Sequence, residues 1–146
     1  GDMADLSVFE DDSFDLIVHP CSNCFVPNVL PVWKEAARVM KHGANLISGI
    51  VNPIVYLFDA QLMEKGEFKV CHKIPYSDLA SLPSEQRQAI LDDDQPFCFG
   101  HSLADQVGGQ IDAGLAITGL FEASWSECLI SEYIPTSIVT KATKLK

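Results

Sequence analysis

Two short apolar segments on either side of an amphipathic segment constrain the fold of this chain more than any other feature. Residues 14–18 and 46–51 are almost continuously apolar and too short for helices, which is typical of strands buried on both faces. Between them, from about Pro31 to Lys41, apolar residues recur at helical spacing. A strand, a helix and a strand joined by short links favour a right-handed crossover between parallel strands. The sequence therefore predicts an α/β fold.

The predicted helix carries its own start and stop signals. Pro31 suits a first helical turn, where its missing N–H leaves no hydrogen bond unmade. Gly43, just beyond the last apolar position, is a candidate for a left-handed helix cap. The predicted buried stripe consists of Trp33, Ala36, Ala37 and Met40, and the predicted solvent face of Lys34, Glu35, Arg38 and Lys41.

The middle of the chain, residues 61–100, is expected to be an irregular surface excursion. Three prolines and the acidic run 92–94 interrupt it. We expect a helix over Val55–Lys65, a short strand over Phe68–Cys71 and a short helix over Pro83–Leu91. Excursions of this length in a compact domain often form lids or substrate loops.

Regular structure is expected to return at His101. Ser102, with Asp105 three residues later, forms a capping box that opens a helix running to about Ala113. The pair 108–109 within this helix consists of glycines, each lowering helix propensity by about 1 kcal/mol relative to alanine. A close packing contact or a break is therefore expected at the glycine pair.

Two strands are predicted near the end of the chain, over Leu115–Glu122 and Ser137–Ala142. A helical turn over Glu127–Tyr133 is expected between them. Lys141 and Lys144 are expected near a margin of the sheet, where charge discourages pairing with another edge. All 146 residues are expected to form a single domain.

The composition narrows the classes of function. The net charge is −10, and such an acidic surface repels phosphate backbones and anionic lipid, so we expect no nucleic-acid and no membrane partner. No apolar run approaches the roughly 20 residues that span a bilayer. The acidic N-terminus is unlike a signal peptide. Five cysteines at irregular spacing favour reduced thiols and a cytoplasmic location.

Five segments, in their order and spacing, resemble the class I S-adenosylmethionine-dependent methyltransferases. The first three are GDMADLSVF at residues 1–9, DDSFDLIVHP at 11–20 and EAARVMKHGANLI at 35–47. The later two, FGHSLADQVGGQIDAGLAITGLFEASW at 99–125 and YIPTSIVTKA at 133–142, are similar to the closing helix and antiparallel hairpin of small-molecule methyltransferases in this group.

The resemblance implies the later half of a Rossmann-like methyltransferase fold. This is a partial doubly wound, mostly parallel sheet with a terminal antiparallel strand. By the same resemblance the chain begins at the end of the third strand and has no counterpart of the glycine-rich loop that holds the methionine end of the cofactor. We therefore expect a truncated domain that is inactive as this chain alone.

The resemblance also carries over individual residues. Asp2 matches the acidic position that accepts from the adenine amino group of S-adenosylmethionine, and Met3 matches the neighbour that packs on the ring. His19 and Pro20 match the position beside the methionine moiety and the transferred methyl. His19 is also a candidate catalytic base, since an unperturbed imidazole titrates near 6.5. The candidate substrate contacts are Asn23, Cys24, Tyr56 and His101.

A metal interpretation of His19-x-Cys21-x-x-Cys24 is weak. A closed zinc site needs four ligands, and the sequence has no second C-x-x-C or H-x₃-H pair. We therefore predict no metal site. Cys98 and Cys128 are expected to be small core residues.

The function predicted from the sequence is S-adenosylmethionine-dependent methyl transfer to a small-molecule acceptor. One alternative is a non-catalytic assembly fragment, or one half of a split enzyme. Another doubly wound nucleotide enzyme, such as a dehydrogenase, explains the crossover equally well but neither GDM before the first strand nor the closing GLFEASW segment. The edge of the 14–19 strand, without its usual neighbour, favours a homodimer through that edge.

Overall fold

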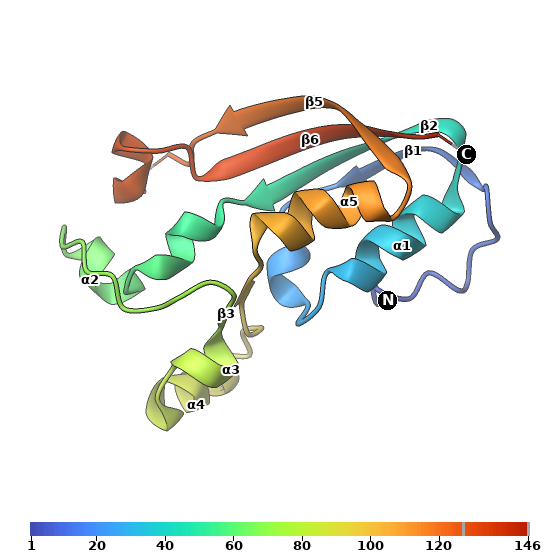
Figure 1. Cartoon of the computed structure of the whole chain (residues 1–146). Coiled ribbons are helices and arrows are strands. Elements are labelled where there is room, and N and C mark those ends of the chain that lie inside the picture. Colours follow the sequence, from blue (N-terminus) through green and yellow to red (C-terminus); the bar gives the residue numbers. More distant parts are fainter. Residues whose placement is uncertain (127, 146) are drawn as a thin grey trace.

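The computed structural model describes residues 1–126 and 128–145, and a four-stranded sheet organises them (Figure 1). The strands are β1 (Phe14–His19), β2 (Met40–Val51), β5 (Leu115–Ala123) and β6 (Ser137–Lys144), in the order β1-β2-β6-β5. β1 and β2 pair in parallel, and β6 pairs antiparallel with both β2 and β5. β1, β2 and β5 thus run in one direction and β6 in the other, which confirms the predicted mostly parallel sheet with a terminal antiparallel strand.

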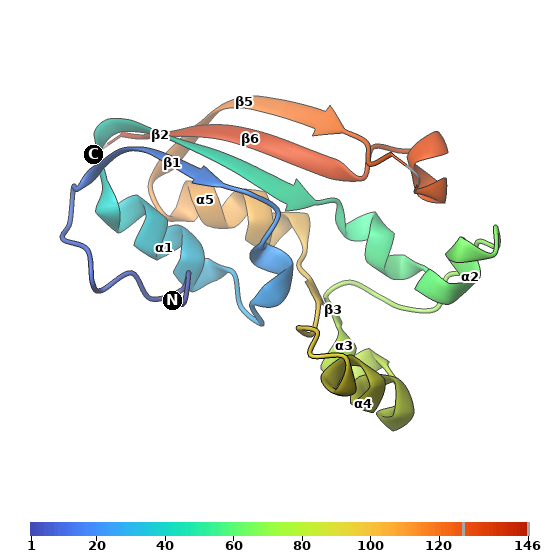
Figure 2. The same cartoon turned by 180° about the vertical axis from the view of Figure 1, so that it is seen from behind.

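One face of the sheet is covered by helices. Helix α1 (Leu30–Val39) and α5 (Gly109–Asp112) lie on the same side of it in both views (Figures 1 and 2). Trp33 on α1 is fully buried, as are Met40 and Leu46 of β2. Three residues of the predicted stripe, Trp33, Ala36 and Ala37, are buried on α1, and the fourth, Met40, is buried as the first residue of β2.

The opposite face of β1 is not covered, so the prediction that this strand is buried on both faces is wrong. Leu16 is 55% exposed and Val18 67% exposed. Phe121 of β5 is also exposed. A continuous apolar segment shows that both faces of the strand are apolar, but it does not show whether both are covered. Within the described residues, helices pack on one face of the sheet only.

The predicted helix cap at Gly43 is also wrong, although the residue does adopt a left-handed φ of +78°. The helix ends at Val39, and Met40 is already extended and pairs with Phe14. Gly43 lies where the register shifts between that pair and the next one, Leu16 with Asn45. Its conformational freedom therefore serves a bend inside β2.

The two lysines expected at a sheet margin lie on β6, which is an interior strand. Lys141 is exposed. Lys144 Nζ donates to Asp12 Oδ1 at 2.8 Å and to the backbone oxygen of Met40 at 2.7 Å. The second lysine therefore links the end of β6 to the segment that enters β1 and to the start of β2.

The excursion after β2 is built from short pieces. A 3₁₀ helix over Pro53–Leu57 and helix α2 (Ala60–Glu64) replace the single helix predicted over Val55–Lys65, because Asp59 between them is extended and caps α2 by accepting from Leu62 N. The strand predicted over Phe68–Cys71 is reduced to one bridge between Phe58 and Val70. Helix α4 (Ser84–Asp92) confirms the predicted short helix, and the remaining pieces are β3 (Tyr76–Ser77), α3 (Asp78–Ser81) and β4 (Phe99–Gly100).

The predicted capping box forms in part, because the carboxylate of Asp105 pairs with the hydroxyl of Ser102 and not with its backbone N–H. Ser102 Oγ donates to Asp105 Oδ2 at 2.7 Å, and Asp105 N donates to Ser102 Oγ at 3.1 Å. A π-helical turn over Ala104–Gly108 follows and passes into α5. Near the C-terminus a 3₁₀ turn covers Leu129–Glu132, and Glu127 of the turn predicted there lies outside the described residues. None of the helices in the described ranges is long and apolar enough to span a membrane.

Candidate active site

A histidine stands at the carboxyl end of β1, where the sheet meets a short helical turn. His19 Nε2 lies 2.6 Å from Asn23 Oδ1, and Asn23 opens the 3₁₀ turn Asn23–Phe25. The imidazole also meets the indole of Trp33 edge to face, with ring centroids 5.7 Å apart. Helix α1 and the loop after β1 thus fix the orientation of the His19 ring.

The hydrogen bonds of Asn23 determine which nitrogen of His19 carries the proton. Asn23 Nδ2 donates to Gln106 Oε1 at 2.8 Å, so its Oδ1 is the atom that faces the imidazole. An amide oxygen only accepts, and therefore His19 Nε2 donates. Burial lowers the pKa of His19, against the opposite effect of the Asn23 hydrogen bond. The ring is consequently neutral at pH 7, with its lone pair on Nδ1.

A buried polar network extends from Asn23 into the helix and the sheet. His101 Nε2 donates to the backbone oxygen of Asn23 at 3.0 Å. Gln110 Nε2 donates to the backbone oxygen of Gln106 at 2.9 Å and accepts through Oε1 from Thr140 Oγ1 at 3.0 Å. All five of these residues are buried. The network ties the loop after β1 to the helix over 104–112 and to β6.

A second group of side chains joins the same loop to the excursion. Hydrogen bonds from the Cys98 thiol and the Tyr56 hydroxyl lower the pKa of Cys24 to about 7, although its burial acts in the opposite direction. The partner thiol of Cys98 has a raised pKa because it hydrogen-bonds to Cys24 and is buried. Burial also raises the pKa of Tyr56. Cys24 is therefore the thiol of this group that ionises first.

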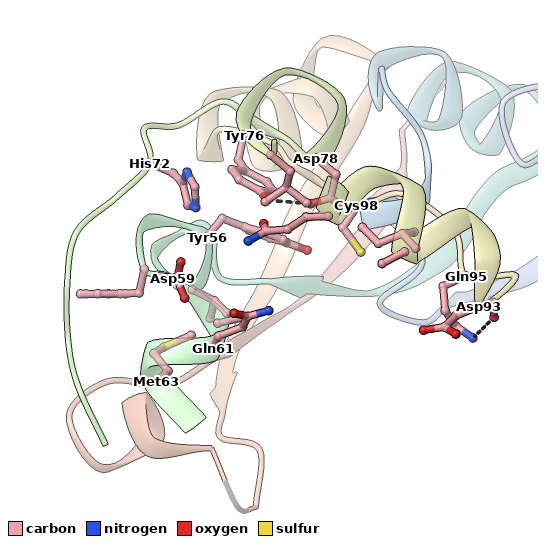
Figure 3. Close-up of a pocket in the computed structure, with 17 residues that line it drawn as sticks. Tyr56, Asp59, Gln61, Met63, His72, Tyr76, Asp78, Asp93, Gln95 and Cys98 are labelled. Carbon is pink, nitrogen blue, oxygen red and sulfur yellow. Dashed lines mark hydrogen bonds between the residues drawn. The ribbon is translucent and has the colours of Figure 1, made fainter. Parts of the chain in front are cut away.

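A cavity of about 480 Å³ lies on the excursion side of Tyr56 and Cys98 (Figure 3). Its wall is formed by the segment after β2, by β3 and by α4. The polar residues labelled around it in the close-up are Asp59, Gln61, His72, Asp78, Asp93 and Gln95. Because Tyr56 and Cys98 both contact Cys24, the cavity borders the loop that follows His19.

The structure brings together some of the site residues expected from the sequence. His19, Asn23 and His101 are joined by hydrogen bonds, and Cys24 contacts Tyr56. Pro20 follows β1, and its backbone oxygen accepts from Ser22 Oγ at 3.1 Å. Asp2 and Met3 lie in the N-terminal loop, where Asp2 Oδ1 accepts from Ala4 N and Met3 packs against the core.

The sequence analysis missed Gln110 and Thr140, and it did not include Gln106 among the site residues. The three side chains are buried at positions that a helix or strand pattern would assign to apolar residues, and this is the signal that could have revealed them. Cys98, expected in the core, lines the cavity. Among the side chains that the structure describes, no three His, Cys, Asp or Glu residues form a group able to hold a metal ion.

Comparison with known proteins shows which proteins this chain is similar to. Residues 1–48 match the family model of a methyltransferase domain. The chain is 50% identical over 145 residues to the uncharacterized methyltransferase YbaJ of Bacillus subtilis (strain 168), a match that covers 99% of this chain and 56% of that protein. The chain thus spans about half the length of this curated relative.

Solved structures of S-adenosylmethionine-dependent methyltransferases share the fold. One from Mesorhizobium loti matches with a TM-score of 0.68 at 14% identity, over 98% of this chain and 67% of its own. A putative one from Listeria monocytogenes also matches with a TM-score of 0.68, at 12% identity, over 100% of this chain and 68% of its own. The mixed sheet, the matched segment at residues 1–48 and the half-identical relative together make this chain similar to S-adenosylmethionine-dependent methyltransferases.

Proposed function

We propose that the loop after β1 forms the reaction end of a site for methyl transfer from S-adenosylmethionine to a small-molecule acceptor. The observation that carries this proposal is the buried link from His19 through Asn23 to Gln106, placed at the carboxyl end of a parallel strand. Open α/β sheets bind ligands at that edge. An imidazole with a fixed orientation and a defined tautomer at this edge is suited to proton transfer, whereas packing alone requires neither.

The cofactor side of the proposed site consists of Asp2, Met3, His19 and Pro20. The exposed carboxylate of Asp2 accepts from Ala4 N and retains acceptor capacity for an adenine amino group, so its chemistry fits. The half-buried Met3 supplies a polarizable side chain that suits the adenine ring. S-adenosylmethionine, when bound, supplies an electrophilic methyl group. His19 and Pro20 border its methionine end in this proposal.

The acceptor side consists of Cys24 and Tyr56 on the rim, with Asn23 and His101 behind them. Asn23 and His101 are buried and hydrogen-bonded to each other, so in this proposal they position the loop. His19 Nδ1 is the atom that takes a proton from the acceptor. Since methyl transfer depends mainly on in-line placement, this proton transfer assists the reaction and does not define it.

We further propose that these 146 residues do not by themselves complete the cofactor site. β1 is followed by PCSNCF and β2 by NPIVY, so no glycine-rich loop after either strand supplies backbone donors for the methionine carboxylate. The five cysteines are free thiols, which supports a cytoplasmic setting.

Calorimetry with S-adenosylhomocysteine tests this proposal. The 146-residue chain is expected to bind with a dissociation constant weaker than about 100 µM. Asp2→Ala should weaken the binding further, while Asp92→Ala, at the exposed end of α4, should leave it unchanged. Micromolar binding would show that the chain completes its cofactor site. Complete absence of binding would contradict the proposed function.

A second candidate function is assembly, and the open face of the sheet favours it. Leu16 and Val18 project from β1, one of the two edge strands of the described sheet, with more than half of each residue exposed. An apolar edge strand of this kind pairs readily with another chain. Under this reading the chain binds a second copy through β1 and binds no S-adenosylhomocysteine.

A further inference from the structure

The cavity beside Tyr56 has an unusual balance of charge. Three carboxylates, those of Asp59, Asp78 and Asp93, line it, and no lysine or arginine of residues 1–126 and 128–145 is part of its lining. The net charge of the chain, −10, adds to the negative potential there. An anion would be repelled from such a cavity and a cation attracted to it.

Asp78 is the most informative of the three. The residue is only 7% exposed, and its two carboxylate oxygens accept from Tyr76 Oη and from Cys98 N, each at 2.6 Å. In the part of the chain that the structure describes, none of the ion pairs involves Asp78. A buried carboxylate normally has a cationic partner, because hydrogen bonds alone offset only part of its lost hydration.

Aromatic rings form the wall next to this carboxylate (Figure 3). Tyr56 and Tyr76 stack with their centroids 5.3 Å apart, and His72 meets Tyr76 edge on at 5.0 Å. The π systems of tyrosines attract organic cations in addition to the attraction of the carboxylates. The apolar part of the lining includes Val55, Phe58, Met63, Leu82 and Ile90, and three glutamines, Gln61, Gln86 and Gln95, line the cavity as well.

We propose that this cavity binds a small organic cation, a protonated amine that carries an apolar body. The ammonium group lies between Asp59 and Asp78 beside the tyrosines, and the apolar body contacts Met63 and the aliphatic side of α4. The volume of about 480 Å³ falls within the range of small-molecule sites, roughly 300–1,000 Å³. In one respect this inference rests on the proposed function. Because Tyr56 borders both the cavity and the proposed methyl-transfer site, the cation bound in the cavity is the class of molecule that accepts the methyl group.

Three probes of nearly the same shape separate charge from packing. Benzylamine is a cation, benzyl alcohol is neutral and benzoate is an anion. Calorimetry on the 146-residue protein at low salt, without any cofactor, should show benzylamine binding at least about tenfold more tightly than benzyl alcohol, a difference of about 1.4 kcal/mol. Benzoate should bind most weakly. Added salt should weaken only the benzylamine complex.

Asp59→Asn is the decisive variant because asparagine keeps the helix cap that Asp59 provides to α2. It should weaken benzylamine binding about tenfold and leave benzyl alcohol binding unchanged. Asp92→Asn removes the same charge from α4 at a residue outside the cavity and should change neither. Circular dichroism of each variant establishes that it is folded.

The proposal is overturned if benzoate binds as tightly as benzylamine, if none of the probes binds, or if the two variants have equal effects. These results are independent of methyl transfer. Selective amine binding by a protein that does not bind S-adenosylhomocysteine would contradict the proposed function and leave the cavity assignment standing. Binding of S-adenosylhomocysteine without binding of benzylamine would contradict the cavity assignment and leave the proposed function standing.

Discussion

The neighbours of His19 fix both the orientation and the tautomer of its ring in the proposed site. An exposed histidine would exchange protons at both nitrogens, but Asn23 fixes the proton on Nε2 and the contact with Trp33 removes part of the ring from water. The basic atom that results, Nδ1, has one orientation. At the residue scale this is the property that distinguishes the site from the other polar clusters of the chain.

The lowered pKa of His19 predicts a pH dependence of stability. The folded-state pKa lies below the ordinary value of 6.5, so the unfolded chain binds more protons between the two values. Stability should therefore be full above about pH 6.5 and fall as the pH drops toward the folded-state pKa. Urea unfolding at about pH 7.5 and 5.5 measures this loss.

The His19→Gln variant should lose less stability over the same interval, because glutamine does not titrate. An identical pH dependence in wild type and His19→Gln would show that His19 is not held in its neutral form.

Cys24 should react with iodoacetamide at a rate that rises through an inflection near pH 7. The hydrogen bonds from Cys98 and Tyr56 favour its thiolate, and Tyr56→Phe, which removes one of them, should move the inflection upward. Peptide mapping by mass spectrometry follows each cysteine separately. An inflection near the ordinary value of 9.0 in the wild type would contradict the arrangement of these three side chains.

Two adjacent glycines provide a matched test at the scale of elements. A Cβ added to Gly109 would lie 2.7 Å from Trp33 Cδ1 and 2.9 Å from Leu30 Cδ2, so α5 can approach α1 only with glycine there. Gly109→Ala should therefore destabilise the chain by about 1–3 kcal/mol. Gly108→Ala meets nothing within 4 Å and should be neutral or stabilising by about 0.5–1 kcal/mol. Equal effects in urea unfolding would contradict the packing of these helices.

The elements best predicted from the sequence are those with local signals. The crossover from β1 through α1 to β2 follows from periodicity, and the capping box at Ser102 from a three-residue spacing. The bend at Gly43 was missed because a left-handed glycine after a helix pattern has the same local signal in a cap and in a strand bend. The exposed face of β1 was missed because burial is set by the other elements that pack on it.

Prediction of the site was limited in the same way, because local signals identify residues that are close in sequence but not residues that only folding brings together. His19 and Asn23 are close in sequence, and a loop after a strand is a recognisable location. Gln106 and His101 join them from about 80 residues away, through contacts that exist only in the folded chain. The cavity walls come from short irregular elements, whose geometry no periodic pattern specifies.

At the scale of the whole molecule, the uncovered face and free edge of β1 predict self-association. Light scattering after size exclusion should show a homodimer at micromolar concentrations. Val18→Lys should shift it toward monomer, because a charge on an edge strand opposes pairing. Lys69→Glu, an exposed charge change on the excursion, serves as the control. A clean monomer of the wild-type chain at high concentration would contradict association through β1.

The central claim, that the end of β1 and the N-terminal loop face one cofactor, is tested most directly by an NMR titration. ¹⁵N-labelled protein is titrated with S-adenosylhomocysteine to about 5 mM, so that even weak binding is detected. The account predicts saturable shifts of the Met3, His19 and Asn23 amides, with α4 unaffected. Shifts confined to α4, or the absence of any saturable shift, would contradict it.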